Sequence, residues 1–239
     1  MAGKLAGGAG GLSDLRLATD GAQLFAGAAR DMLPVLADWY RDVPATPGTR
    51  LDRLGAFTPF LAAPGPIAEL ASKLLGRPAR PVRAIAFDKS PDANWALGWH
   101  QDRTINVAAR AEVAGFGPWT VKQGHLHVQP PFTLIERMVT LRIHLDPVTP
   151  DNAPLEIAIG SHRKGLIAEP RIAEVVATCE SRACLAAPGD VWAYATAILH
   201  ASRRSASAGP RRVLQVDYSA DTLPAPLDWA LTFGDPAFS

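Results

Sequence analysis

After residue 80, hydrophobic positions gather in short runs separated by clusters of proline and glycine. The run at residues 138–145 reads Met-Val-Thr-Leu-Arg-Ile-His-Leu, an alternation typical of a half-buried strand. Other runs with strand character lie at residues 82–87, 95–106, 155–159, 190–194, 199–203 and 212–218. Turn residues between the runs, such as Pro188 and Gly189, separate them into about seven or eight predicted strands.

The first third of the chain has helical rather than strand-like spacing. From Asp20 to Trp39 apolar residues recur at helical intervals, and Pro44 would end that helix. A second helix is predicted at residues 66–75, before a glycine and a proline. We also expect a short helix within residues 169–179.

Short strands that follow a helical segment predict a mainly β fold with flanking helices, of the sandwich or jelly-roll kind. The length of 239 residues fits a single domain of this class. We expect residues 1–80 to form a mainly helical part packed on the barrel, residues 81–220 to form the core, and residues 221–239 to form a C-terminal tail.

Charge and composition narrow the classes of protein. The chain has 24 basic and 23 acidic residues, without the basic surplus of nucleic-acid-binding proteins. No apolar stretch reaches the roughly 18 residues of a membrane span, and the N-terminus lacks a signal-peptide core. Cys179 and Cys184 alone form neither a disulfide framework nor a zinc site. We expect a cytoplasmic protein with a small-molecule substrate and no nucleic-acid or membrane partner; its oligomeric state is not determined by the sequence.

The segment at residues 99–102, Trp-His-Gln-Asp, holds the first candidate for chemistry. In a strand, residues i and i+2 project from one face, so His100 and Asp102 would point the same way. With a third ligand, such a pair completes the facial triad of non-haem iron(II) oxygenases, which leaves open positions on the metal. His200, in another strand-like run, is a candidate for that ligand. A His-x-Asp pair also arises by chance, and His200 could equally be a hydrogen-bonded core residue.

Arg211 follows His200 across a predicted turn. If that turn is a hairpin centred at residues 207–208, Arg211 pairs with Arg204, about 13 Å along the strand from His200. This distance suits a five-carbon dicarboxylate, whose distal carboxylate a guanidinium would bind with two hydrogen bonds. A shift of one residue would point Arg212 inward instead, and both arginines could also be solvated charges.

Several segments keep the order and spacing of one known family: residues 99–102, 139–152, 155–156, 160–165 and 189–191, together with His200, Ser202 and Arg211. Over about residues 80–220 the chain resembles the phytanoyl-CoA dioxygenase family. The resemblance implies a double-stranded β-helix, which is a cupin-like jelly roll. It also implies a reaction in which a C–H bond of a small-molecule metabolite is hydroxylated while 2-oxoglutarate is converted to succinate and CO₂.

The cofactors and their residues also follow from the resemblance. It implies catalytic iron(II) at His100, Asp102 and His200, with 2-oxoglutarate and O₂ as co-substrates. Arg211 and Ser202 would bind 2-oxoglutarate, and Trp119 falls near a family tryptophan that lines the same pocket. Halogenating relatives carry a small residue in place of the carboxylate, so an aspartate there favours hydroxylation. The segment at residues 152–154 departs from the family's usual Asn-Gly, so the substrate is not identified as phytanoyl-CoA.

Three residues are candidates for contact with the primary substrate. His127 and Gln129 lie in a polar and aromatic segment between two predicted strands, and Lys89 precedes the first metal-binding segment, where it could attract an acidic substrate. Each of the three could also be structural. The alternatives to an oxygenase are a non-catalytic jelly-roll protein that binds a metal or a small ligand, and a zinc hydrolase that uses the same three ligands.

Overall fold

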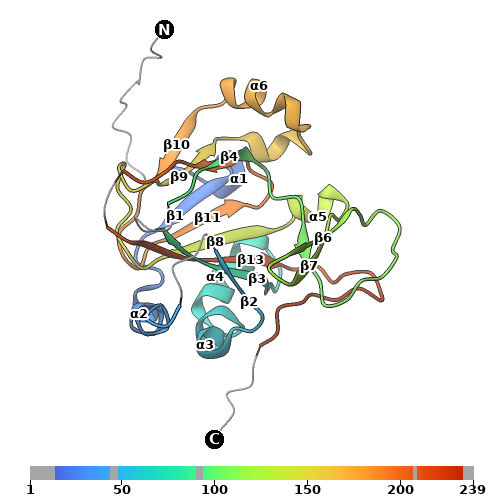
Figure 1. Cartoon of the computed structure of the whole chain (residues 1–239), viewed down its shortest axis with the longest axis horizontal. Helices are drawn as coiled ribbons and strands as arrows, with labels where there is room; N and C mark the ends of the chain where they lie inside the picture. Colours follow the sequence, from blue (N-terminus) through green and yellow to red (C-terminus); the bar gives the residue numbers. More distant parts are fainter. Residues whose placement is uncertain (1–13, 44–47, 90–93, 207–208, 234–239) are drawn as a thin grey trace, which may run out of the picture.

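The computed structural model describes residues 14–43, 48–89, 94–206 and 209–233 (Figure 1). The helices are α1 Leu17–Asp20, α2 Leu33–Trp39, α3 Thr58–Leu61, α4 Pro66–Leu75, α5 Phe132–Glu136 and α6 Ile172–Ala177, with 3-10 turns at Arg30–Met32, Gly55–Phe57, Ser161–Lys164 and Glu169–Arg171. The strands are β1 Ala22–Phe25, β2 Thr49–Leu51, β3 Arg80–Lys89, β4 Leu97–His100, β5 Ile105–Asn106, β6 Trp119–Lys122, β7 His125–Val128, β8 Val139–His144, β9 Leu155–Ala158, β10 Ser181–Cys184, β11 Val191–Ala195, β12 His200–Ser202 and β13 Arg211–Ser219.

Two antiparallel sheets face each other and form the predicted jelly roll. The large sheet has the strand order β1-β11-β8-β13-β3-β2, and the small sheet has the order β10-β9-β12-β4. In Figure 1 the small sheet lies above the large one, with α6 on its outer side and α2, α3 and α4 beneath the large sheet. Leu155 and Ile157 of the small sheet share a hydrophobic cluster with Trp192 and Tyr194 of the large sheet, so the two sheets are in direct contact.

Strand β8 shows how the hydrophobic pattern positions the site. Leu141 and Ile143 belong to the hydrophobic core that also contains Ile67 and Ala71 of α4. The alternate residues, among them Thr140 and Arg142, are polar yet also buried. Because successive side chains of a strand point to opposite faces, the apolar face packs on the helices and the polar face lies between the sheets. The alternation in β8 predicted a strand with one exposed face, but both faces of β8 are buried.

The helical pattern of the first third was only partly right. Helix α4 has the predicted limits. The helix predicted from Asp20 was wrong at residues 22–25, because α1 ends where Gly21 takes a left-handed conformation (φ 82°) and the chain continues as strand β1. Strand β1 pairs with β11 and covers an edge of the large sheet. Backbone pairing along a free sheet edge overrides local helical spacing here.

A third sheet and the C-terminal segment flank the barrel. Strands β5, β7 and β6 form a three-stranded sheet, with a tight turn at Gln123 and Gly124, both at positive φ. Within the described part of the tail, Trp229 is buried and bridges to Val107, so this segment packs on the domain. Over the described ranges, no helix has the length and apolar character needed to cross a bilayer.

Candidate active site

Strands β12 and β4 bring the three predicted metal ligands together. His200 is the antiparallel partner of His100, and their ring centroids are 4.2 Å apart. Asp102 follows β4 after one intervening residue, and the potential ligand atoms of the three residues all lie within 4.8 Å of one another. In the part of the chain that the structure describes, this is the one such group of three. The pair from one segment and the distant histidine thus converge as the sequence predicted.

Backbone carbonyls orient both imidazoles. Nδ1 of His100 lies 2.7 Å from the Gly98 carbonyl oxygen, and Nδ1 of His200 lies 3.0 Å from that of Ile198. A carbonyl only accepts hydrogen bonds, so both Nδ1 atoms carry the proton and both Nε2 atoms remain free to bind a metal. Burial and the neighbouring His100 lower the pKa of His200 to about 4, which keeps its imidazole in the neutral, metal-binding form.

The carboxylate of Asp102 is held by Arg83, a residue that the sequence analysis did not identify. Arg83 donates to Asp102 (2.8 Å) and to Asp217, whose other oxygen accepts from Thr140 (3.0 Å). Burial alone would raise the pKa of Asp102, but the charges of Arg83 and the two imidazoles outweigh it and hold the pKa at about 2. Asp102 is therefore ionised at neutral pH, as a metal ligand must be.

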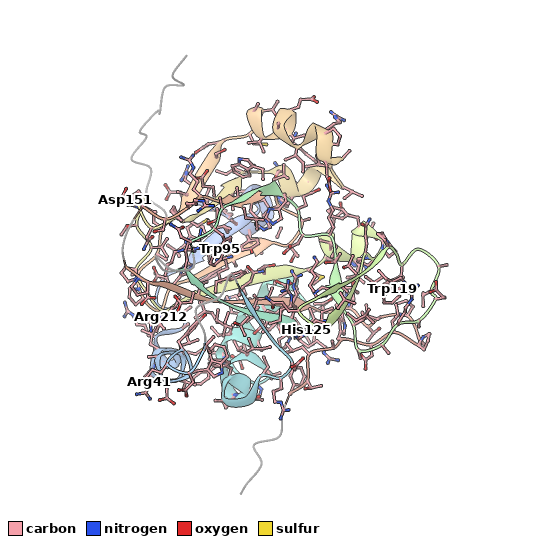
Figure 2. All side chains as sticks on the ribbon, in the orientation of Figure 1. Arg41, Trp95, Trp119, His125, Asp151 and Arg212 are labelled. Atoms are coloured by element: carbon pink, nitrogen blue, oxygen red, sulfur yellow. The ribbon has the colours of Figure 1, made fainter. Side chains whose placement is uncertain are left out.

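A cavity of about 930 Å³ opens beside the triad, between the two sheets. Its lining includes all three candidate ligands, Ser202 and Arg211. The backbone of Trp95, which also lines the cavity and is labelled in Figure 2, accepts a hydrogen bond from Lys89. A cavity of this volume is within the range of small-molecule sites.

One end of the cavity is cationic. Arg211 is 2% exposed, and its Nε is buried without a hydrogen-bond partner. No ion pair of Arg211 is present within the described ranges. Burial, reinforced by the charge of Arg142, lowers the pKa of Arg211 to about 9. Arg142 also lines the cavity; it donates to Gln215 (2.8 Å) and its own Nε is buried without a partner. Two buried guanidiniums with unused donors call for an anionic ligand.

The pairing of β13 differs from the expected hairpin. Strand β13 pairs with β3 and β8 of the large sheet, whereas β12 belongs to the small sheet, so Arg211 is opposite Lys89 rather than Arg204. The predicted turn centre at residues 207–208 lies outside the described residues. Arg212 points to the other face, where it forms a bidentate ion pair with Asp146 (2.7 and 2.9 Å). The hairpin was wrong, yet Arg211 enters the cavity from the opposite sheet.

Several predicted contact residues do not line the cavity. His127 is fully buried on β7, with Nδ1 2.9 Å from the His125 carbonyl oxygen. Trp119 lies on β6 next to the guanidinium of Arg110, and Gln129 follows β7 in the same flanking sheet. The lining on this side instead contains Lys122 and Gln123. The position of this segment in the chain suggested that it lies near the site, but only the end of β6 and the adjoining turn reach the cavity.

Lys89 is likewise buried rather than exposed in the cavity. Its ammonium donates to the backbone of Trp95 (2.7 Å) and of Arg203 and contacts Ser202 Oγ (3.2 Å), so it joins β3 to the small sheet. These contacts satisfy the group structurally and leave no donor directed at the cavity. Burial, then the charges of Arg211 and Arg142, lowers its pKa to about 7.

The pH dependence of stability tests this position of Lys89. In the unfolded chain a lysine keeps its proton up to its ordinary pKa near 10.4, so the unfolded state binds more protons above pH 7. The free energy of unfolding should therefore rise between about pH 7.5 and 9, by up to about 1.4 kcal/mol per pH unit. Chemical denaturation at several pH values measures this slope, and Lys89→Met should remove it. A flat wild-type profile would show that the hydrogen bonds of the ammonium offset the effect of its burial.

A jelly roll that joins two histidines and one carboxylate beside an arginine-lined cavity defines a class of protein, the non-haem iron, 2-oxoglutarate-dependent oxygenases. The sequence model of the family described as Phytanoyl-CoA dioxygenase (PhyH) matches residues 56–213, more than half of the chain. The chain belongs to this family.

Solved structures share the fold at low sequence identity. AviO1 from Streptomyces viridochromogenes Tue57 is 21% identical, with a TM-score of 0.61 over 87% of this chain and 94% of that chain. EctD from S. alaskensis in its apoform is 17% identical, with a TM-score of 0.64 over 92% and 86%. HygX from Streptomyces hygroscopicus, solved with nickel, 2-oxoglutarate and hygromycin B, is 16% identical, with a TM-score of 0.57 over 85% and 84%. Among curated proteins, none matches the sequence significantly.

Proposed function

We propose that the protein hydroxylates a C–H bond of a small-molecule metabolite, using iron(II), 2-oxoglutarate and O₂ and releasing succinate and CO₂. The observation that carries this proposal is the position of the triad, which opens on a cavity that also contains the unpaired, buried guanidinium of Arg211. The family and a structural relative solved with 2-oxoglutarate support it. The cytoplasmic location stays a prediction.

The donor set fits iron(II). Two imidazoles with free Nε2 atoms and one ionised carboxylate form a 2-His-1-carboxylate group, which leaves the remaining coordination positions for other ligands. When bound, iron(II) supplies the activation of O₂ that is coupled to the decarboxylation of 2-oxoglutarate. Arg83 acts through Asp102: it keeps the carboxylate ionised and fixes its direction, as outer-shell partners do in metal sites.

The arginine-lined end fits 2-oxoglutarate. Arg211 would bind the distal carboxylate of the co-substrate, and Arg142 would add positive charge beside it. Pairing with a carboxylate relieves the unfavourable free energy of a buried, unpaired guanidinium, so the site is preorganised for a dianion. Ser202 lines the cavity close to this end, because Lys89, the partner of Arg211 on β3, contacts its hydroxyl. We propose Ser202 as a second contact for the co-substrate.

Addition of iron(II) and 2-oxoglutarate to the protein without O₂ tests the proposal. Bidentate binding of 2-oxoglutarate to iron is expected to give a visible charge-transfer band. On exposure to O₂, one succinate should form for each 2-oxoglutarate consumed. A protein that retains iron but gives neither signal would be a non-catalytic metal-binding jelly roll. Hydrolytic activity with zinc and without 2-oxoglutarate would indicate a metal hydrolase.

A further inference from the structure

A second cationic group lines the cavity on the side away from Arg211. It consists of Arg50, on edge strand β2, and Lys122, at the end of β6 next to the β6–β7 turn. A hydrogen bond of 3.1 Å from Arg50 to Gln123 joins the strand to the turn, and Gln123 in turn donates to the Gly48 carbonyl (2.8 Å). This group was not apparent in the sequence, because β2 lies in the part of the chain predicted to be helical.

Strand register separates this group from the arginines proposed for 2-oxoglutarate. Arg142, Gln215, Ile85 and Arg50 form one cross-strand row over β8, β13, β3 and β2. With neighbouring strands about 4.8 Å apart, the backbones of Arg142 and Arg50 are about 14 Å apart. All four residues of the row line the cavity. A 2-oxoglutarate bound at Arg211 and Arg142 would therefore leave Arg50 without an anionic partner.

Within the described ranges, no ion pair neutralises the charge of this second cationic group. Arg50 Nε is buried without a hydrogen-bond partner, and neither Arg50 nor Lys122 has an ion pair within the described ranges. Burial, followed by repulsion from Arg83, lowers the pKa of both groups. The nearby carboxylate of Asp102 is already bound by Arg83 and directed at the metal position. An anion from outside the protein would stabilise this arrangement.

Apolar residues form a further part of the lining. Trp95 and Leu97 precede the triad, and Ile172 and Ala173 of α6 line the cavity as well. Leu97 is 50% exposed and therefore presents apolar surface at the cavity. A ligand that binds here meets both an apolar surface and the two cations.

We propose that the primary substrate is an amphipathic acid whose anionic oxygen group, a carboxylate or a phosphate ester, binds between Arg50 and Lys122. This proposal rests on the proposed function, since it assigns the space that iron and 2-oxoglutarate leave free. The anion would fix one end of the substrate, and the apolar part would lie beside the metal position. Arg50 and Lys122 would then determine specificity by binding the substrate rather than by taking part in the reaction.

Binding of matched acids and amides tests the proposal. The protein is loaded with nickel(II), which does not support turnover, and saturated with 2-oxoglutarate so that Arg211 is occupied. Calorimetry then compares benzoate with benzamide, phenylacetate with phenylacetamide, and indole-3-acetate with indole-3-acetamide. At least one acid is expected to bind at least about 10-fold more tightly than its amide, a difference of about 1.4 kcal/mol. The affinity for phenyl phosphate, compared with those for the carboxylic acids, shows whether the second cationic group binds a phosphate ester or a carboxylate more tightly. If no acid binds more tightly than its amide, and phenyl phosphate binds no more tightly than phenol, the proposal is wrong.

Variants that remove one charge test whether Arg50 and Lys122 cause the tighter binding of acids than of amides. Arg50→Gln and Lys122→Gln should each reduce acid binding at least about 10-fold, leaving amide binding, 2-oxoglutarate affinity and melting temperature unchanged. The control is Arg171→Gln, which removes an exposed arginine paired with Glu174. Loss of 2-oxoglutarate affinity in Arg50→Gln would place the co-substrate at the second cationic group and overturn the proposal. If the wild-type protein does not bind 2-oxoglutarate, the proposed function is refuted instead. The anion site can still be tested in that case, because acids should bind more tightly to the wild type than to Arg50→Gln in the absence of 2-oxoglutarate.

Discussion

Replacement of His200 with alanine should abolish succinate formation and weaken iron(II) binding by more than the roughly 10–100-fold that loss of an outer-shell partner costs. The substitution removes one of the three proposed ligands and leaves only the pair His100 and Asp102. Because the imidazole of His200 is neutral when folded, its removal leaves no unpaired charge in the core. Iron content after anaerobic dialysis, together with succinate release, measures the effect.

His127→Ala is the matched control for iron binding. His127 is also buried, also on a strand, and its Nδ1 also faces a carbonyl two residues earlier, but it lies outside the ligand cluster. Burial chiefly lowers its pKa to about 4, so it resembles His200 in charge state as well. The control variant should retain stoichiometric iron. If His200→Ala retained both iron and turnover, His200 would not belong to the triad.

Arg211→Ala should weaken the binding of 2-oxoglutarate by about 30- to 4,000-fold. Truncation of one partner in a buried, hydrogen-bonded charge pair costs about 2–5 kcal/mol, and each 1.4 kcal/mol corresponds to a factor of ten. The effect should fall on the dissociation constant, because the triad that binds the metal is unchanged. Titration of the charge-transfer band of the iron(II) protein without O₂ gives that constant directly.

The neighbouring arginine provides the control for this prediction. Arg212 has the same chemistry and is one residue away, but its guanidinium binds Asp146 on the opposite face of β13. Arg212→Ala should leave the affinity for 2-oxoglutarate unchanged and affect stability only modestly, as expected for a partly exposed ion pair. A large loss of affinity in Arg212→Ala, with little in Arg211→Ala, would reverse the assignment.

Local patterns were sufficient to predict much of the barrel and the pairing of His100 with Asp102 in the candidate site. Every strand-like run predicted after residue 80 contains a strand, and α4 has the predicted limits. The geometry of the ligand pair is local too, because residues i and i+2 of an extended segment share a face whatever surrounds them. The family spacing added the third ligand, and the structure places His200 opposite His100.

Contacts across the sheets were not predictable in the same way. Lys89, His127 and Gln129 were placed near the cavity by their positions in the chain, but none of them lines it. Arg142 did carry a signal, since it belongs to the polar face of a strand whose other face is apolar. Arg83 carried no comparable signal, because its importance lies in its pairing with Asp102 and Asp217, which are distant in sequence.

By itself, the sequence determined which residue types could bind iron, which segments extend as strands, and the class of fold that they build. Only the tertiary structure decided which charges face the cavity, because Arg50, Arg83, Arg142 and Arg211 come from β2, β3, β8 and β13, which become neighbours through strand pairing. The side-chain period of a strand is two, so a shift of one residue would exchange Arg211 for Arg212 at the site. That register follows from packing over both faces of the sheet, which no local pattern contains.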